Sequence, residues 1–280
     1  MTDADRTRAY YAGFDARELT RLDAPGDGAI EFFITTERLG RYLAPGSRVL
    51  DVGGGPGRYT VWLAEHGHRP TLLDLSPNFI EMARQQVAAS PASSRVEAVM
   101  EGDARDLSRF GDGSFDAALC LGPMYHLQAE RDRRAVAGEL NRVLAPGATA
   151  YVAWMPRLLF LRRSIVVPEE RRHLLDEAFV RAVVDEGRFD NDVPGRFDNG
   201  YGASPDEIEP FMDTAGFDTV ELLAAESFAA GGIGDYVAEF AEQEPEILPR
   251  LLDLLSEHAA DPGLLAGANH LLWIGRKRPG

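Results

Sequence analysis

The sequence predicts an α/β fold in which a mostly parallel sheet of seven strands carries helices on both faces. Two observations favour this fold. Between residues 47 and 154, short β-branched apolar runs alternate with amphipathic stretches, which is typical of repeated βαβ units. A glycine-rich loop follows the first of these runs and leads directly into a helical stretch, as in open parallel sheets that bind ligands at their strand ends.

Apolar runs and helix-stop signals divide the chain into elements. The predicted strands are residues 48–52, 69–74, 95–100, 115–121, 149–154, 217–223 and 270–275. The predicted helices are residues 5–22, 28–43, 57–65, 77–89, 131–144, 205–215 and 236–258. Ser76 before Pro77 is a predicted N-cap, and Ser204 with Glu207 has the pattern of a capping box.

Residues 155–202 interrupt this alternation. They consist of a charged helical stretch followed by a loop over residues 190–200 that is rich in Asp, Asn and Gly. We therefore expect an insertion there and not an independent domain.

The charge of the chain argues against a nucleic-acid partner. Its 45 acidic and 29 basic side chains give a formal net charge of -16, which repels phosphate backbones. The dense basic cluster within residues 162–172 is interleaved with Glu169 and Glu170, a pattern typical of a solvated helix face. We expect no binding to nucleic acid.

Cysteine content and hydropathy predict a cytoplasmic protein without a membrane partner. Cys120 is the only cysteine, so an intramolecular disulfide is excluded. No apolar run approaches the roughly 18 residues of a membrane span. The first residues also lack the basic and apolar regions of a signal peptide.

The strongest motif is the run Val-Leu-Asp-Val-Gly-Gly-Gly-Pro-Gly from Val49 to Gly57. Glycines let the backbone approach a ligand closely, and the N-terminus of the next helix offers unpaired amides. A tight structural turn would also use glycines. The nicotinamide fingerprint needs a third glycine at position 58, where the chain has Arg58, and the spacing instead reads Asp-x-Gly-x-Gly-x-Gly.

This spacing resembles motif I of the class I S-adenosylmethionine-dependent methyltransferases, of the bacterial type that methylates small molecules. The resemblance implies a Rossmann-like fold and S-adenosylmethionine as the cofactor, bound at Asp51, Gly53, Gly54 and Gly55. It extends along almost the entire chain, so we expect one domain over residues 1–280. Its parts are an N-terminal helical lid (1–45), a cofactor-binding core (47–154), a substrate-side insertion (155–203) and the C-terminal part of the sheet (204–280).

Two acidic segments extend the resemblance. Asp74 ends the second predicted strand, where the family's acidic residue accepts hydrogen bonds from ribose hydroxyls, and Leu75 would lie against adenine. A helix-capping role for Asp74 is the alternative, although Ser76 already occupies that position. In the segment 101–107, the resemblance assigns Asp103 and Ala104 to the adenine.

A fourth segment, Leu-Cys-Leu-Gly-Pro-Met-Tyr-His-Leu over residues 119–127, resembles the Gly-Pro-Leu-Tyr-His-Leu run of bacterial small-molecule methyltransferases. Leu121 and Gly122 are expected at the cofactor, and Tyr125 and His126 at the acceptor. His126 is the candidate catalytic base, because the pKa of a histidine can lie near working pH. It could equally orient the loop.

The remaining assignments concern the edges of the site. Tyr11 resembles an aromatic residue that the family places over the methionine end of the cofactor, and packing of the first helix is the alternative. We expect no metal, because the available oxygen ligands lie in the turn-rich loop 190–200. Possible acceptor-lining side chains in the insertion are Arg157, Phe160, Arg163, Phe197 and Tyr201.

The sequence thus predicts transfer of a methyl group from S-adenosylmethionine to an oxygen or nitrogen of a small molecule. Two alternatives remain. One is a protein that uses the cofactor for a non-methylating reaction or as an effector. The other, disfavoured by Arg58, is a nicotinamide-dependent oxidoreductase. The sequence assigns neither an individual acceptor nor an oligomeric state.

Overall fold

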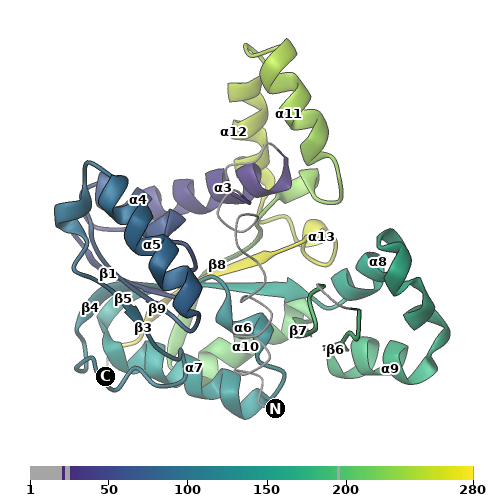
Figure 1. Cartoon of the computed structure of the whole chain (residues 1–280), viewed down its shortest axis with the longest axis horizontal. Coiled ribbons are helices and arrows are strands. Elements are labelled where there is room, and N and C mark those ends of the chain that lie inside the picture. Colours follow the sequence, from purple (N-terminus) through teal and green to yellow (C-terminus); the bar gives the residue numbers. More distant parts are fainter. Residues whose placement is uncertain (1–20, 23–25, 194–195, 280) are drawn as a thin grey trace.

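The computed structural model describes residues 21–22, 26–193 and 196–279 (Figure 1). Tyr11 and residues 5–20 of the first predicted helix lie outside the described residues.

A central sheet forms the body of the molecule. Its order is β3-β2-β1-β4-β5, continued by β9 and β8, with a hairpin of β7 and β6 at the end of β5. The bounds are Arg48–Val52 for β1, Arg69–Asp74 for β2, Ala98–Glu101 for β3, Phe115–Cys120 for β4, Leu144–Pro156 for β5, Phe217–Ala224 for β8 and Leu271–Lys277 for β9. The first five strands are mutually parallel, and β9 runs antiparallel between β5 and β8. The predicted mostly parallel α/β sheet is confirmed.

The sheet has nine strands and not the seven that we predicted. The extra strands are β6 (Arg188–Asp190) and β7 (Asn199–Ala203), which pair with each other and reach β5 where Met155 lies opposite Gly202. We did not predict these two strands, because they are short and rich in Asp, Asn and Gly, a composition typical of loops. Glycine at position 202 allows close packing, since a Cβ there would lie 2.7 Å from the Cα of Arg157.

Helices cover both faces of the sheet. One face carries α3 (Asp27–Tyr42), α4 (Arg58–Glu65), α5 (Pro77–Ala89), α11 (Gly234–Gln243) and α12 (Leu248–His258). The other carries α6 (Pro123–His126), α7 (Glu130–Val143), α10 (Pro205–Thr214) and α13 (Pro262–Leu265). The insertion holds α8 (Leu159–Val166) and α9 (Glu177–Glu186), joined by the 3₁₀ helix η2 (Pro168–Leu175). Two shorter 3₁₀ helices are η1 (Ser93–Arg95) and η3 (Ser227–Ala229).

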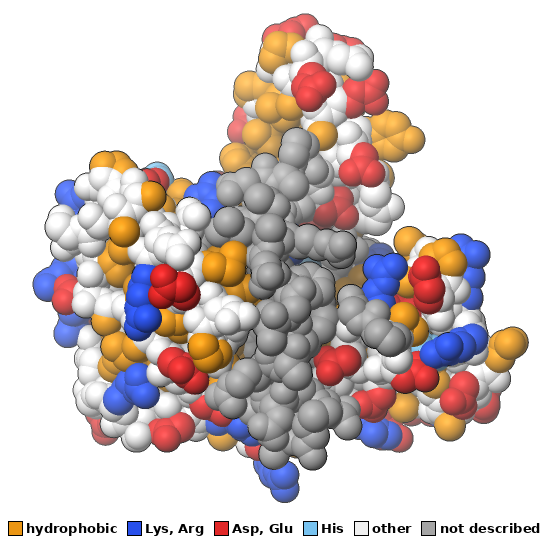
Figure 2. Space-filling view, viewed as in Figure 1, with side chains coloured by type: hydrophobic (Ala, Val, Ile, Leu, Met, Phe, Trp, Pro, Cys, Tyr) orange, Lys and Arg blue, Asp and Glu red, His pale blue; other side chains and the backbone are white. Residues whose placement is uncertain are grey.

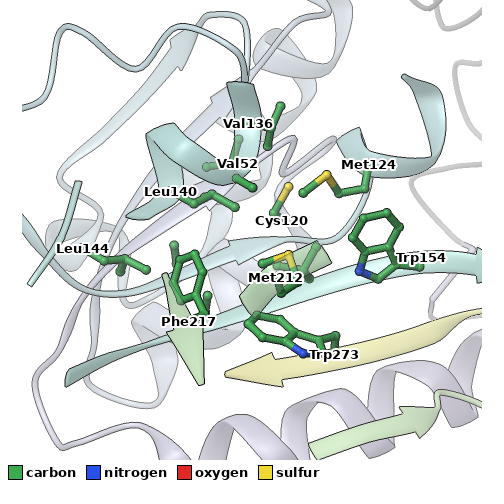
Figure 3. Close-up of a cluster of buried hydrophobic side chains, with 14 of the residues drawn as sticks. Val52, Cys120, Met124, Val136, Leu140, Leu144, Trp154, Met212, Phe217 and Trp273 are labelled. Atoms are coloured by element: carbon green, nitrogen blue, oxygen red, sulfur yellow. The ribbon is translucent and has the colours of Figure 1, made fainter. Parts of the chain in front are cut away.

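Successive side chains of each strand point to opposite faces of the sheet, so the core is divided into two layers. On β9, Trp273 packs toward α7 and α10, whereas Leu272 and Ile274 pack toward α3 and α12. Figure 3 shows the first layer, in which Cys120 lies beside Met124 and faces side chains of α7. Burial raises the pKa of the Cys120 thiol, so this side chain behaves as a small apolar core residue.

Two predicted helix ends have different outcomes. Ser76 caps α5 as predicted, and its Oγ accepts a hydrogen bond from Phe79 N at 3.4 Å. The capping box at Ser204 is wrong, because its hydroxyl donates to Asp206 and makes no capping bond. Its expected partner, Glu207, instead accepts from Arg157 at 2.8 Å.

The predicted helix over residues 236–258 is two helices. α11 ends at Gln243, the next residue Glu244 has a non-helical backbone (φ -134°, ψ 59°), and Pro245 follows it. A residue before proline is disfavoured in the helical region, which explains the break. The resulting hairpin of α11 and α12 projects from the body, as does the insertion (Figure 1). Acidic side chains are spread over both projections in Figure 2, and on the insertion basic side chains lie among them.

Candidate cofactor and acceptor site

A cavity that opens to solvent lies where the chain leaves β1, β2, β3 and β4 at the carboxyl edge of the sheet. This is the edge at which open α/β sheets bind ligands. The structure brings together here all the described residues that we assigned to the site: Asp51, Gly53, Gly54, Gly55, Asp74, Leu75, Asp103, Ala104, Leu121, Gly122, Tyr125 and His126.

The loop after β1 depends on its glycines. Gly53 has φ of +70° and Gly55 has φ of +53°, a region that side-chain-bearing residues rarely adopt. A Cβ on Gly53 would lie 2.7 Å from the ring of Pro123. A Cβ on Gly54 would lie 2.8 Å from the carboxylate of Asp51. The loop therefore presents bare backbone to the cavity, as a closely approached ligand requires.

Asp51 is buried beneath this loop. Its carboxylate accepts a hydrogen bond from Thr60 Oγ1 at 2.7 Å. Burial, with a contribution from the negative charge of Asp74, raises the pKa of Asp51 to about 6. Because this pKa lies close to neutral pH, a positive charge that enters the cavity would shift the ionisation of Asp51.

Asp74 joins two loops. Its Oδ2 accepts a hydrogen bond from Gly55 N at 2.9 Å, and its Oδ1 accepts from Ser76 N at 2.8 Å. The helix-capping alternative is therefore partly correct, since the carboxylate does bond to the amide at the start of α5. Asp74 also lines the cavity, where a carboxylate can accept the hydroxyl groups of a ligand.

Asp103 is paired within the cavity wall. Arg105 approaches its carboxylate at 2.6 Å and also donates its backbone amide at 2.9 Å. Arg105 lies 3.3 Å from Asp132 as well. Our sequence reading missed Arg105, although its position two residues after Asp103 was a visible signal. It also missed Arg21, Tyr59 and Phe79, which line the cavity.

Tyr125 and His126 lie in α6, in the part of the cavity wall where we expect the acceptor. The Tyr125 hydroxyl donates to Leu121 O at 3.0 Å. His126 packs between the rings of Tyr125 and Phe197, with centroid distances of 5.0 and 5.1 Å. Burial lowers the pKa of His126 to about 3, so the expectation of a pKa near working pH is wrong. The imidazole stays neutral and is a poor proton acceptor.

The side chains of the insertion that we expected to line the cavity lie elsewhere. Phe160 stacks on Phe189 at 4.4 Å, and Arg163 pairs with the buried Glu170 at 2.9 Å. Arg157, Phe197 and Tyr201 likewise pack within the insertion or against α10 and do not line the cavity. An insertion of this size needs a core of its own, and these residues provide it.

One group of side chains in the described part of the chain has the spacing of metal ligands. Atoms of Glu31, Glu226 and His270 lie within 4.8 Å of one another. Arg21 already neutralises Glu31 at 2.6 Å. The group is thus satisfied as an ion-pair network, and the absence of a metal stays a prediction.

The residues of the cavity fit a nucleoside cofactor. The bare loop after β1 leaves room that any Cβ would fill, and Asp74 and Asp103 end the neighbouring segments. Leu75, Phe79 and Ala104 add apolar surface for a base. Among the helices of the described residues, none combines the length and the apolar character that a membrane crossing requires.

Comparisons with known proteins agree with this geometry. Residues 49–147 match the family model described as "Methyltransferase domain". A ubiquinone biosynthesis O-methyltransferase of Xanthomonas campestris is 33% identical over 119 residues, which cover 42% of this chain and 46% of that protein. The chain therefore spans about half the length of the curated relatives it matches.

Two solved structures share the fold over most of the chain. The Methanosarcina mazei S-adenosylmethionine-dependent methyltransferase has a TM-score of 0.60 and 17% identity, covering 87% of this chain and 98% of its own. The Burkholderia thailandensis 1,6-didemethyltoxoflavin-N1-methyltransferase has a TM-score of 0.55 and 17% identity, covering 99% and 87%. The chain therefore has the Rossmann-like fold of the class I methyltransferases, and residues 49–147 match a methyltransferase domain.

Proposed function

We propose that this protein transfers a methyl group from S-adenosylmethionine to an oxygen or nitrogen of a small molecule. The observation that carries the proposal is the position of the glycine loop and Asp74 on one cavity, with Asp74 bonded to the loop itself. The matched methyltransferase model and the O-methyltransferases among the relatives support the same reaction.

The cavity offers a place for each part of the cofactor. The loop of Gly53, Gly54 and Gly55 would hold the methionine portion, with Tyr11 as a further contact, and Asp74 would accept the ribose hydroxyls. Leu75 and Ala104 would flank the adenine, whose amino group would meet Asp103. Leu121 and Gly122 would close the cofactor side, next to Tyr125 and His126 at the acceptor.

The bound cofactor would supply a methyl group on a sulfonium, which is already an activated leaving group. The protein therefore contributes mainly alignment and exclusion of water. Tyr125 is suited to this task because the bond from its hydroxyl to Leu121 O holds the ring in the wall. His126 is neutral and would orient the acceptor through packing or hydrogen bonding, not through proton transfer.

Charge and cysteine chemistry support the partners and compartment we propose. A net charge of -16 disfavours a nucleic-acid acceptor. The basic side chains of residues 162–172 are engaged within the protein, since Arg163 pairs with Glu170 and Arg172 with Asp192. The buried Cys120 thiol needs no oxidising environment, which agrees with a cytoplasmic location.

The first test is calorimetric titration of the full chain with S-adenosylmethionine and, separately, with NAD. Asp74→Asn keeps the size of the side chain and removes its charge. We expect it to weaken S-adenosylmethionine binding by about 100-fold, the value of two charged hydrogen bonds. Asp116→Asn is the matched control, because Asp116 pairs with Arg48 away from the cavity. Binding of NAD, or no binding of either ligand, would refute the proposal.

The second test separates methyl transfer from the non-methylating alternative. The protein is incubated with S-adenosylmethionine and a panel of phenolic and amine acceptors, and S-adenosylhomocysteine is measured. Its formation together with a product 14 mass units heavier than the acceptor is the expected result. Tight cofactor binding with no S-adenosylhomocysteine from any acceptor would favour an effector or cyclisation role.

A further inference from the structure

A network of four charged or titratable side chains, of which Glu31 and Glu226 are buried, lies beside the cavity and has no part in the function described so far. Glu31 of α3 pairs with Arg21 at 2.6 Å. His270 Nδ1 lies 2.9 Å from Glu226 Oε1 and 3.4 Å from Glu31 Oε2. We refer to Arg21, Glu31, His270 and Glu226 as the His270 network.

Glu226 fixes the imidazole of His270 in place. The carboxylate is 1% exposed, and its second oxygen accepts the backbone amides of Asn269 and His270 at 3.1 Å each. With that oxygen occupied, Oε1 is left to accept the proton on Nδ1. Nε2 on the opposite edge of the ring is then the nitrogen available to accept a proton.

The network adjoins the acceptor side of the cavity. His270 directly precedes β9, whose first residue lies opposite Trp154 near the carboxyl end of β5, and Glu226 follows β8 at the same edge. The ring of His270 is 6.0 Å from that of Tyr125; Tyr125 and Arg21 line the cavity, and His270 lies behind them in the same wall. The His270 side chain keeps 17% of its surface exposed.

The charges around His270 favour its protonated form. Glu31 of α3, Glu226 before η3, Arg21 and Tyr125 of α6 are the charged and titratable groups that face it. Burial alone would lower the pKa of His270, but the two carboxylates outweigh burial and raise it. The pKa of Glu31 is lowered, because Arg21 and His270 outweigh the effect of burial. His126 has no comparable carboxylate among its described contacts.

We propose that His270 accepts the proton that the acceptor loses during methyl transfer, and this proposal rests on the function proposed above. The bond from sulfur to the methyl carbon breaks and its electron pair stays on sulfur. A bond forms from the acceptor oxygen or nitrogen to that carbon, and the proton of the same atom passes to Nε2 of His270. The resulting imidazolium is stabilised by Glu226 and Glu31.

The charge balance of the reaction favours transfer of the proton from the acceptor to His270. Arg21, Glu31 and Glu226 together carry one negative charge, which a protonated His270 neutralises. A sulfonium in the cavity competes with that proton electrostatically, and the neutral thioether left after transfer does not. His270 therefore binds a proton more tightly once the methyl group has left.

The first experiment needs no acceptor. The imidazole signals of the full chain are titrated by NMR alone, with S-adenosylmethionine and with S-adenosylhomocysteine, and His270→Gln identifies the signal of His270. We expect a lower pKa of His270 with S-adenosylmethionine than with S-adenosylhomocysteine. Equal values with both ligands bound would overturn the proposal. Absence of binding of either ligand would refute the proposed function itself, so the two failures are distinguishable.

The second experiment measures kcat against pH with an acceptor that yields S-adenosylhomocysteine. For the wild type we expect kcat to rise with pH through one ionisation. His270→Gln should remove this rise and lower kcat by about 100-fold or more, a typical contribution of a general base. The affinity of His270→Gln for S-adenosylmethionine should stay within about twofold of the wild type. This would show that the variant has lost a base and is still folded.

Three variants complete the design. Glu226→Gln should shift the rise to lower pH, because loss of a carboxylate lowers the pKa of His270. His126→Gln should retain the rise, and the exposed His258→Gln should match the wild type throughout. A rise that survives in His270→Gln, or that disappears only in His126→Gln, would overturn the proposal.

Discussion

The cofactor side and the acceptor side of the cavity are held in shape by different interactions. On the cofactor side, backbone geometry dominates: Gly53 and Gly55 adopt positive φ, and Asp74 bonds to the amides of two loops. Beyond the proposed acceptor side, the insertion packs against His126 through Phe197 and is held by contacts among its own side chains. Arg163 and Asn191 both donate to the buried Glu170, and aromatic rings stack beside them.

This difference indicates which substitutions each side of the cavity can tolerate. The loop after β1 tolerates few substitutions, because a Cβ on Gly53 or Gly54 collides with a neighbour and the positive φ of Gly55 disfavours a side chain. A site supported by side-chain clusters can be rebuilt by replacing whole clusters, since its shape depends on their volume and charge. We therefore expect the insertion to determine which acceptor enters, while the loops after β1 and β2 serve the cofactor.

The largest effect should come from the buried ion pair of the insertion. Glu170→Ala leaves Arg163 without its partner; because the Arg163 side chain is 25% exposed, we expect a cost of about 3 kcal/mol, the low end for loss of one member of a buried pair. We expect hydrogen exchange in α8 and α9 to accelerate while binding of S-adenosylmethionine is kept. Glu177→Ala, which breaks an exposed pair with Arg181, is the control and should change stability by less than about 0.5 kcal/mol. If Glu170→Ala lost cofactor binding to the same extent as stability, the two sides of the cavity would not be held independently.

A second prediction concerns pH on the cofactor side. Because the pKa of Asp51 is raised to about 6 from 3.8, its stabilising contribution is complete below pH 4 and is lost as the pH rises through 6. Asp51→Asn removes this loss and keeps an oxygen for Thr60. The ligand-free variant should be more stable than the wild type at pH 8 by about 2 to 3 kcal/mol. Urea denaturation from pH 4 to 8 measures the difference, which should shrink toward pH 4; a constant difference would contradict the assignment.

A third prediction tests the tight packing of the glycine loop. In Gly54→Ala the new methyl group meets Asp51 and Leu72 at 2.8 Å, and such overpacking costs about 1 to 3 kcal/mol. Cofactor affinity should fall with stability, because the loop must shift. Gly40→Ala is the control, since no atom lies within 4 Å of its added Cβ. Unchanged cofactor affinity in Gly54→Ala would show that the cofactor does not depend on the exact backbone position of this loop.

The smallest effect should have the opposite sign. Gly138 lies exposed in α7, and a Cβ there meets nothing within 4 Å. Gly138→Ala should stabilise the protein by about 0.5 to 1 kcal/mol, because glycine is unfavourable within a helix. Thermal unfolding measures it, and cofactor binding should stay the same. A destabilised variant would mean that α7 needs a glycine for a contact beyond this chain.

The sequence predicted those parts of the molecule whose signals are local. β1, β2 and α5 have the predicted bounds, because strand, glycine loop and cap follow one another within a few residues. Asp74 was found for the same reason. The His270 network was not found, since its members come from segments separated by most of the chain and only folding brings them together.

The acceptor side was misread for a second physical reason. Phe160 and Phe197 stood out as aromatic residues in a polar stretch, and we took them for cavity lining. In the structure they form the insertion's own core, which a sequence pattern does not distinguish from a binding surface. The pKa of His126 was misjudged likewise, because its burial, to which the distant Phe197 contributes, is not visible in the local sequence.

The position of β9 has a consequence for how the protein is made. β9 is the last strand along the chain, yet it lies between β5 and β8, and it is the only strand with which β8 pairs in the described sheet. On the ribosome, β1 to β5 can assemble while β8 still lacks a neighbour. The sheet, and with it the contact of His270 with Glu31, is completed only after residues 271–277 have left the exit tunnel. Such late, long-range pairing is slow, so the apolar edge of β5 is exposed to aggregation until β9 has been made.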